Sequence, residues 1–172
     1  RLTVQKGFDL LQDALDGLLS RDLQFVLLGT GDRHYEEFFS KAAVKYPGKA
    51  GVRIAFDDSM AHRIIAGSDL LLMPSHYEPC GLAQLHGLRY GTIPVVRATG
   101  GLRDTIEEFD PKRSSGNGFV FHSYKAEDLL QAVERALNLF HRKEEWITLM
   151  KNAMSTDFSW SRSAQMYLDL YQ

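Results

Sequence analysis

Short apolar segments alternate with amphipathic helical patterns along this sequence, and that alternation limits the fold more than any other feature. After Gly7, leucines and alanines recur at steps of three and four, which is the pattern of one buried helix face. The predicted strands span residues 23–29, 52–56, 70–73, 93–96 and 118–122, and the helices among them span 33–46, 58–67 and 82–89. This order predicts an α/β domain of three layers, in which a parallel sheet has helices on both faces.

The size and charge of the chain exclude several classes of protein. Its 172 residues, 44% of them hydrophobic, suffice for one domain with its own core. A net charge of -2 and a pI of 6.3 do not suit a nucleic-acid-binding protein. No apolar run approaches the roughly 20 residues that span a bilayer, so no membrane partner is expected. The opening residues RLTVQKG lack the apolar core of a signal peptide and are typical of the end of a strand or of a loop, so the chain is expected to be a fragment.

Several motifs follow predicted strands, where the loops of a parallel sheet gather. In open α/β sheets, ligands usually bind outside the carboxyl ends of the strands. RLTVQKG, GTGDR, FDDS, PSHYEPCGL and RATGGLRD all fall near such loops. GTGDR begins like a dinucleotide-binding fingerprint, but His34 stands at its third glycine position, which favours a plain tight turn. The segment FDPKRSSGNG is rich in turn residues and is expected to be a mobile surface loop.

The segment EPCGL places Glu78 just before a predicted helix. The backbone amides of Gly81, Leu82 and Ala83 are expected to point out of the N-terminus of that helix, where unpaired amides favour a phosphate group. A carboxylate beside such an anion site accepts hydrogen bonds from hydroxyl groups, which suits a sugar attached to the phosphate. The alternative is that Glu78 only caps the helix.

Two basic residues, Arg1 and Lys6, flank the first loop. A guanidinium binds a diphosphate through paired hydrogen bonds and a lysine adds a point charge. Together, these two positive charges can neutralise a departing diphosphate without a metal ion. Basic residues in this arrangement are more often part of a solvated surface, which is the alternative interpretation.

Other residues near the strand ends have both a ligand-binding and a structural interpretation. Thr99, Gly100 and Gly101 follow a strand directly and bring backbone amides near a ligand, but an ordinary strand-to-helix turn uses the same glycines. Phe56 offers a flat face on which a base stacks, although a core phenylalanine is commoner. Cys80, the only cysteine, has no histidine base in its own segment and is expected to pack as a small apolar residue.

Taken in order, four segments resemble the C-terminal domain of bacterial glycogen synthase and plant starch synthase: RLTVQKGFDLL, LLGTGD, AHRIIAGSDLLLMPSHYEPCGLAQLHGLRYGTIPVVRATGGLRDT and NGFVF. The likeness covers nearly the whole chain. It implies a Rossmann-like domain that forms the C-terminal half of a GT-B glycosyltransferase fold, with the nucleotide sugar in the cleft between the halves. Residues 1–172 are then the nucleotide-sugar-binding domain. The N-terminal catalytic and acceptor domain lies outside this chain.

The resemblance also implies an activity, namely transfer of glucose from ADP-glucose, or in some members from UDP-glucose, to the nonreducing end of an α-1,4-glucan with retention of configuration. The implied partners are these two substrates and the missing N-terminal domain. ADP is the product, and neither a cofactor nor a metal is expected. Alone, the chain is expected to be inactive. The implied location is the cytoplasm of a bacterium or the plastid of a plant.

The family's site residues map onto this sequence one by one. The arginine and lysine of R-L-T-x-Q-K-G correspond to Arg1 and Lys6, and the resemblance implies that they hold the diphosphate. Glu78 is implied to face the donor glucose. The implied nucleotide-sugar contacts come from Phe56, which stacks on adenine, from the amides of Cys80, Gly81, Leu82 and Ala83, and from the glycine-rich turn at Thr99, Gly100 and Gly101.

Position 86 distinguishes between branches of the GT-B group. Many retaining enzymes of that group carry a second glutamate eight positions after the first, where this sequence has His86. The glycogen and starch synthase branch generally lacks that glutamate, so His86 argues against sucrose synthases and lipid glycosyltransferases. His62 and His86 lack the spacing of a metal site. The remaining alternative is a noncatalytic nucleotide- or carbohydrate-binding module that works alone.

Overall fold

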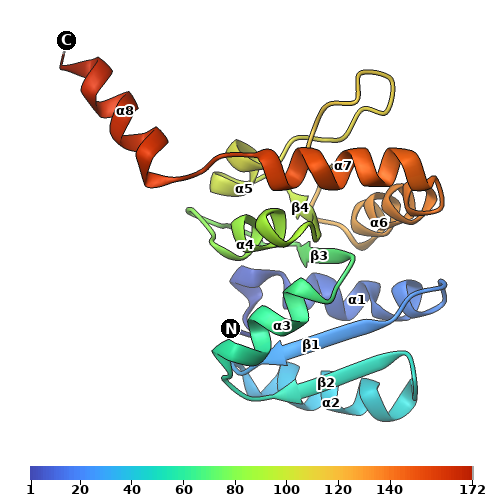
Figure 1. The fold of residues 1–172 in the computed structure, drawn as a ribbon. Coiled ribbons are helices and arrows are strands. Elements are labelled where there is room, and N and C mark those ends of the chain that lie inside the picture. Colours follow the sequence, from blue (N-terminus) through green and yellow to red (C-terminus); the bar gives the residue numbers. More distant parts are fainter. Residues whose placement is uncertain (172) are drawn as a thin grey trace.

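The structure is a computed structural model that describes residues 1–171, and it alternates helices with strands along the chain (Figure 1). The strands are β1 (Phe25–Gly29), β2 (Ala50–Ile54), β3 (Leu70–Met73), β4 (Ile93–Arg97) and β5 (Phe119–Phe121). The helices are the short 3-10 helix η1 (Val4–Lys6), α1 (Phe8–Leu19), α2 (Arg33–Lys45), α3 (Asp58–Ala66), α4 (Ala83–Tyr90), α5 (Gly100–Thr105), α6 (Ala126–Phe140), α7 (Lys143–Ser155) and α8 (Trp160–Leu170). The predicted alternation of strands and helices is therefore confirmed.

The strands pair in parallel, as expected, but they are divided between two sheets. β1 pairs with β2, and β4 lies between β3 and β5. Beside the end of β1 lies Leu2 and not β3. The Leu2 N–H donates to the carbonyl of Thr30 (3.0 Å), and the Leu2 carbonyl accepts from the N–H of Asp32 (2.8 Å). The first residues of the chain thus reach the edge where the strands end.

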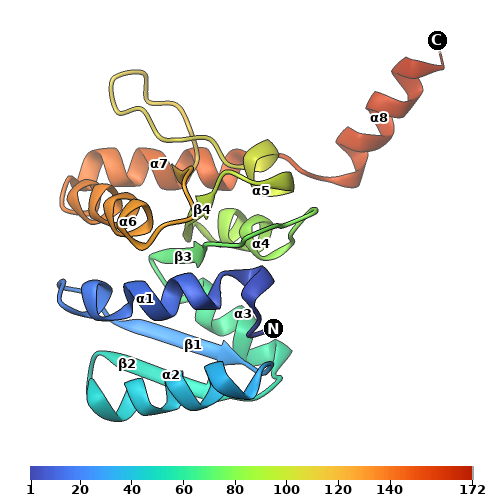
Figure 2. The ribbon, with the colours of Figure 1, turned by 180° about the vertical axis from the view of Figure 1, so that it is seen from behind.

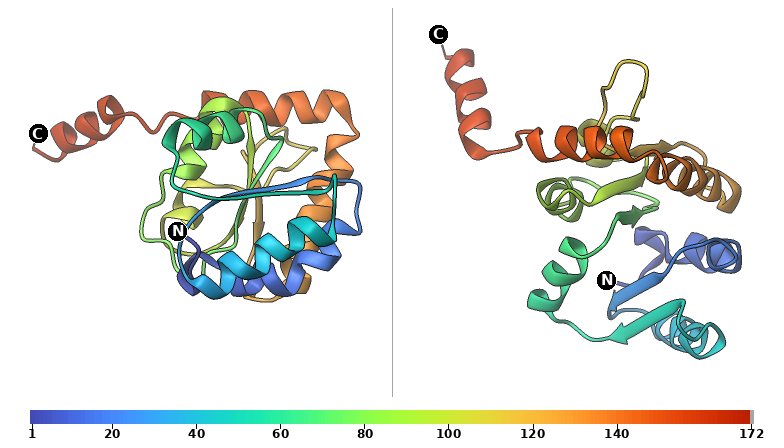
Figure 3. Two further views of the ribbon diagram at one scale, coloured as in Figure 1. Left: turned by 90° about the horizontal axis from the view of Figure 1, so that it is seen from below. Right: turned by 45° about the vertical axis from the view of Figure 1, so that its right-hand side comes forward.

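Helices lie on both sides of the β3–β4–β5 sheet (Figure 3), as the predicted layers require, whereas alternate residues of β1 and β2 are exposed, Val26 at 53%, so one face of that pair stays open. α1 packs against α2 and α6, whereas α4 packs against α3 and α7. β4 contacts α4, α6 and α7, so it is covered on both faces. β4 is consequently the most buried strand, because its first four residues, 93–96, are all buried. β3 is equally apolar, yet all four of its residues are only partly buried.

Individual boundaries differ from the predicted ones by one or two residues. β2 ends at Ile54 and not at residue 56, which leaves Phe56 in the loop before α3. α4 begins at Ala83, one residue later than predicted. The loop at 109–118 is exposed at residues 111–114 and closes on itself, because Asp110 and Ser115 exchange backbone hydrogen bonds of 2.8 and 3.3 Å. Its expected mobility stays a prediction.

The last helix, α8, projects away from the remainder of the molecule (Figures 1 and 2). It begins after Ser159, whose hydroxyl accepts a hydrogen bond from the N–H of Arg162. Its large apolar residues are exposed, with Trp160 88% and Leu170 79% accessible to solvent, and Tyr171, which follows the helix, is 88% accessible. Among residues 1–171, no helix is long and apolar enough to cross a membrane.

Candidate functional site

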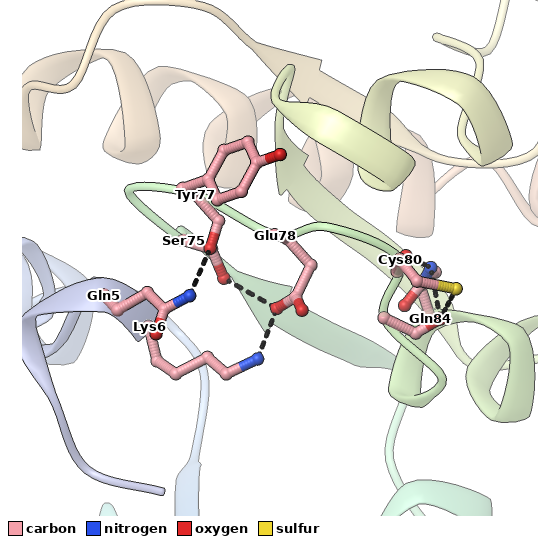
Figure 4. Close-up of polar contacts among 8 residues, drawn as sticks. Gln5, Lys6, Ser75, Tyr77, Glu78, Cys80 and Gln84 are labelled. Carbon is pink, nitrogen blue, oxygen red and sulfur yellow. Dashed lines mark hydrogen bonds and ion pairs between the residues drawn. The ribbon is translucent and has the colours of Figure 1, made fainter.

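A lysine and a glutamate that lie 72 positions apart in the sequence form an ion pair at the centre of the site (Figure 4). The ammonium of Lys6 lies 2.6 Å from the Oε2 atom of Glu78. The glutamate side chain is 5% exposed and the lysine side chain 31% exposed. The hydroxyl of Ser75 donates a second, longer hydrogen bond of 3.3 Å to the same carboxylate oxygen. The pair is therefore buried on its acidic side and open to solvent on its basic side.

Backbone hydrogen bonds hold the two halves of this pair in place. The carbonyl of Gln5, in η1, accepts the N–H of His76 at 2.9 Å. The side-chain amide of Gln5 reaches the carbonyl of Tyr77 at 3.5 Å (Figure 4). The short η1 helix is thus attached to the loop that leaves β3, and this attachment brings Lys6 to Glu78.

Arg97, at the carboxyl end of β4, fixes the same loop from the other side. Its Nε donates to the carbonyl of Ser75 at 2.9 Å, and a terminal guanidinium nitrogen donates to the carbonyl of His76. The guanidinium also lies over the ring of Tyr124, with 5.4 Å between the guanidinium carbon and the ring centroid. Burial, together with the hydrogen bond that its hydroxyl donates to Asp9, raises the pKa of Tyr124 well above its usual range.

The glycine-rich turn after β4 packs directly against the loop that carries Glu78. The N–H of Gly101 donates to the carbonyl of Glu78 at 2.9 Å. A Cβ atom on Gly100 would collide with that same carbonyl oxygen, and a Cβ atom on Gly101 would collide with the carbonyl oxygen of Cys80. The structural interpretation of these glycines is therefore confirmed, since the two turns meet backbone to backbone. Their contact with a nucleotide sugar stays a prediction.

The EPCGL turn leads into α4 without a side-chain cap. Leu82 stands at the N-cap position, is 64% exposed and makes no capping hydrogen bond through its side chain. The alternative in which Glu78 caps the helix is wrong, because its carboxylate is turned toward Lys6 and Ser75. The amides that begin α4 at Ala83 therefore keep their capacity to bind an anion.

Three further predicted residues are exposed. Phe56 is 92% exposed, so the core interpretation is wrong and the ring is accessible for stacking. Cys80 is exposed as well, which corrects the expectation that it packs as an apolar residue, because it lies in the turn before α4 and outside the core. Arg1 is exposed next to Leu2, at the end of β1. Among residues 1–171, a hydrogen bond and ion pair join Lys6 to Glu78, and no such bond joins Arg1 or Phe56 to that pair.

The two histidines weighed as metal ligands stack on each other between α3 and α4. The ring centroids of His62 and His86 are 4.9 Å apart, and the Nδ1 of His62 lies 3.0 Å from the hydroxyl of Tyr90. Within residues 1–171, no group of three or more histidine, cysteine, aspartate or glutamate side chains lies close enough to hold a metal ion.

Some residues that shape the site were not singled out from the sequence. Arg97, Ser75 and Gln84 each hold a loop through hydrogen bonds to backbone carbonyls or to Glu78. A signal existed for Arg97, since it directly follows the predicted strand 93–96 and opens the RATGG motif. The roles of Ser75 and Gln84 depend on contacts that appear only when the two turns are folded together.

This arrangement has the chemistry of a site for a phosphorylated, hydroxyl-bearing ligand. The Lys6 ammonium has three N–H donors, of which Glu78 takes one, and the N-terminus of α4 adds further donors. Two surface hollows lie elsewhere, one lined by α2 residues with Ile54 and the other lined by β5 and α6 residues.

Comparison with known proteins places the chain among glycosyltransferases. The model of the family "Glycosyl transferases group 1" matches residues 1–152. The chain is 53% identical over its whole length to a glycogen synthase of Kosmotoga olearia and 54% identical to one of Thermotoga maritima. In each case it spans 36% of the relative's length.

A solved structure agrees with these relatives. The catalytic domain of starch synthase IV from Arabidopsis thaliana, bound to ADP and acarbose, superimposes with a TM-score of 0.89 at 37% identity. That match covers 99% of this chain and 36% of the starch synthase chain. The fold is accordingly that of a GT-B glycosyltransferase domain, and the chain belongs to the glycosyl transferases group 1 family.

Proposed function

We propose that this chain is the donor-binding half of a glycogen or starch synthase, which transfers glucose from ADP-glucose to the nonreducing end of an α-1,4-glucan with retention. The observation that carries the proposal is the Lys6–Glu78 pair beside the N-terminus of α4. It joins a cation, a carboxylate and helix amides, which are the groups that a sugar diphosphate needs. The resemblance to glycogen synthases over the full chain supports the same assignment.

Each group has a role that follows from its chemistry. Lys6 keeps its ammonium in place through Glu78 and uses its remaining N–H groups on the diphosphate. Arg1 adds a second cation, and the amides from Cys80 to Ala83 face the sugar and the distal phosphate. Glu78 accepts hydrogen bonds from the glucose hydroxyls with the oxygen that the lysine does not use. Phe56 supplies an exposed ring on which adenine stacks.

The transfer of glucose requires stabilisation of the departing diphosphate. The bond from the anomeric carbon to the diphosphate oxygen breaks as the acceptor hydroxyl approaches the same face of the sugar, and the hydroxyl proton passes to the departing diphosphate. Negative charge then grows on that diphosphate, where Lys6 and Arg1 lie. Preorganised groups aimed at developing charge commonly contribute about 3 kcal/mol each. No resident cofactor or metal is included in the proposal.

The chain spans 36% of the length of the curated relatives it matches, so the proposal includes a partner. That partner is the N-terminal part of a longer protein, which would supply the acceptor groove. The exposed apolar side chains of α8 support it, since Trp160, Leu170 and Tyr171 are each more than three-quarters exposed in this chain. If the source is a bacterium, we propose that the enzyme acts in the cytoplasm.

Calorimetric titration with nucleotides tests the proposal. ADP is expected to bind the chain saturably and more tightly than UDP, and Lys6→Met is expected to weaken ADP binding by roughly tenfold or more. Gln131→Met, an exposed change on α6, serves as the control. Equal binding of ADP to wild type and Lys6→Met would contradict the diphosphate role of Lys6.

A second experiment separates this proposal from that of a module that works alone. The chain and the longer protein encoded by its native reading frame are compared for incorporation of glucose from ADP-glucose into glycogen. Incorporation by the longer protein only is expected. Robust incorporation by the 172-residue chain alone would refute the need for a second domain.

A further inference from the structure

A buried glutamine joins the two turns that form the candidate site. Gln84 is the second residue of α4 and is fully buried. We propose that Gln84 is a positioning residue, which turns the backbone carbonyls of Cys80 and Gly81 inward so that the amides at the start of α4 face a phosphate. The inference rests on the proposed function and names the group that orients its anion site.

The hydrogen bonds of the side-chain amide carry this inference (Figure 4). Its Nε2 donates to the carbonyl of Cys80 at 2.9 Å and to the carbonyl of Gly81 at 3.1 Å. A third, longer contact of 3.4 Å reaches the hydroxyl of Thr105. The two carbonyl acceptors determine which way the amide faces, because a flipped amide would direct its own oxygen at them.

The oxygen of the same amide shows how tightly the turn is packed. The Oε1 atom of Gln84 is buried and has no hydrogen-bond partner among residues 1–171. Gly81 has a φ angle of +76°, and a Cβ atom there would collide with that oxygen. A buried oxygen without a hydrogen-bond partner costs free energy. The fold accepts that cost at Oε1 while the N–H groups on Nε2 of the same amide donate to the carbonyls of the turn. This distribution of hydrogen bonds is expected of a group that orients the backbone.

Orientation matters here because a peptide group has two ends. Amides at a helix N-terminus attract an anion, whereas a carbonyl oxygen aimed at the same place repels it. The carbonyls of Cys80 and Gly81 belong to the residues just before α4, so either of them facing outward would lie beside the phosphate. Gln84 satisfies both carbonyls from inside the protein.

The same side chain connects the EPCGL turn with the glycine-rich turn after β4. The hydroxyl of Thr105 donates to the carbonyl of Gly101 at 2.6 Å, and the N–H of Gly101 donates to the carbonyl of Glu78 at 2.9 Å. A closed set of contacts therefore runs from Glu78 through Gly101 and Thr105 to Gln84 and back to Cys80. A change at Gln84 is expected to act on the anion site through this backbone and not through a direct contact with ligand.

The test compares the affinity for ADP with that for AMP, measured by calorimetry on wild type, Gln84→Met and the exposed control Gln131→Met. Because the α4 amides face the distal phosphate, Gln84→Met is expected to lower the ADP affinity about tenfold and to leave the AMP affinity within about twofold. The control is expected to change neither. A purely structural role would lower both affinities together, and that result would overturn the inference.

The isosteric variant Gln84→Glu adds a pH profile. At alkaline pH, where the carboxyl is ionised, it faces two carbonyl oxygens without a donor, so the preference for ADP over AMP is expected to be lost. Burial favours the protonated acid, which has one O–H to donate, so the preference is expected to return as the pH is lowered. A preference for ADP that equals the wild-type preference at every pH would overturn the inference.

A measurement on the wild-type chain decides the matter if both variants fail to fold. Adding inorganic diphosphate is expected to shift the backbone amide signals of Gly81, Leu82 and Ala83 in nuclear magnetic resonance spectra, while the Gln84 side-chain amide stays protected from exchange. Rapid exchange of that amide would overturn the inference. No saturable binding of ADP or diphosphate by wild type would refute the proposed function itself, which is a distinguishable outcome.

Discussion

Removing the ammonium of Lys6 leaves Glu78 as a buried carboxylate without a counter-charge. In Lys6→Met, the long apolar stem is kept and only the charged group is lost. The Ser75 hydroxyl, at 3.3 Å, is then the remaining side-chain partner of that carboxylate. Because the glutamate side chain is 5% exposed, it cannot turn to solvent without moving the loop. We therefore expect the variant to lose stability as well as nucleotide affinity.

The size of the stability loss in Lys6→Met follows from the unequal burial of Lys6 and Glu78. Loss of one member of a fully buried pair costs about 3–5 kcal/mol. The lysine side chain is 31% exposed, so water reaches the vacated space, and we expect a smaller loss of about 2 kcal/mol. For a domain of this size that loss lowers Tm by about 4–8 °C. The double variant Lys6→Met/Glu78→Gln removes both charges and is expected to recover more than half of the loss.

Urea denaturation, followed by circular dichroism, gives the free energy of unfolding of wild type, Lys6→Met, Glu78→Gln and the double variant. The coupling free energy between Lys6 and Glu78 is expected to exceed about 1 kcal/mol and to persist at high salt. Arg33 and Glu37, whose side chains are 89% and 52% exposed, provide the matched control pair, with an expected coupling below about 0.5 kcal/mol that salt removes. Additive effects of Lys6→Met and Glu78→Gln would show that the ion pair does not hold the loop.

Three other changes test separate parts of the structure. Gly101→Ala is expected to destabilise the chain by about 1–3 kcal/mol, because its Cβ atom meets the Cys80 carbonyl, whereas Gly51→Ala has open space around its Cβ atom and serves as the control in thermal unfolding. Phe56→Ala is expected to leave Tm unchanged and to weaken ADP binding about tenfold, while Phe56→Tyr binds normally; equal affinities would contradict adenine stacking. The pKa of Tyr124 is raised in the folded chain, so above pH about 10 this tyrosine ionises in the unfolded chain while it stays neutral in the folded one. The free energy of unfolding is therefore expected to fall as the pH rises, and to fall less in Tyr124→Phe.

The order of elements was predictable from the sequence because it depends on local periodicity. The helix after Gly7 has a periodicity that only a helix satisfies, and the strand at 70–73 follows from a short apolar run between turn residues and Pro74. The division into two sheets was not predictable, since apolar character does not tell which neighbours a strand pairs with. β3 and β4 are both short apolar segments, yet β4 is buried along its first four residues while β3 is only partly buried.

The candidate site was predictable in its residue types but not in its contacts. Lys6 and Glu78 were each assigned to a different part of the ligand, and the structure pairs them with each other. The glycines at 100 and 101 suggested either a ligand-binding turn or an ordinary strand-to-helix turn, and their packing against Glu78 and Cys80 accounts for them without a ligand. Such contacts join segments more than 20 positions apart, and no local pattern in the chain encodes them.

The pairing of Lys6 with Glu78 bears directly on how such a site would accelerate glucosyl transfer. An ammonium that is already paired with a buried carboxylate attracts the ground-state diphosphate less strongly than a free one would. As charge grows on the departing diphosphate, the attraction of Lys6 for the phosphate rises while its attraction for Glu78 stays the same. The interaction is therefore stronger in the transition state than in the ground state, and only such a difference raises the rate of the chemical step. Glu78→Gln should then bind ADP at least as tightly as wild type while the longer enzyme turns over more slowly, and a parallel loss of ADP affinity and turnover would refute this account.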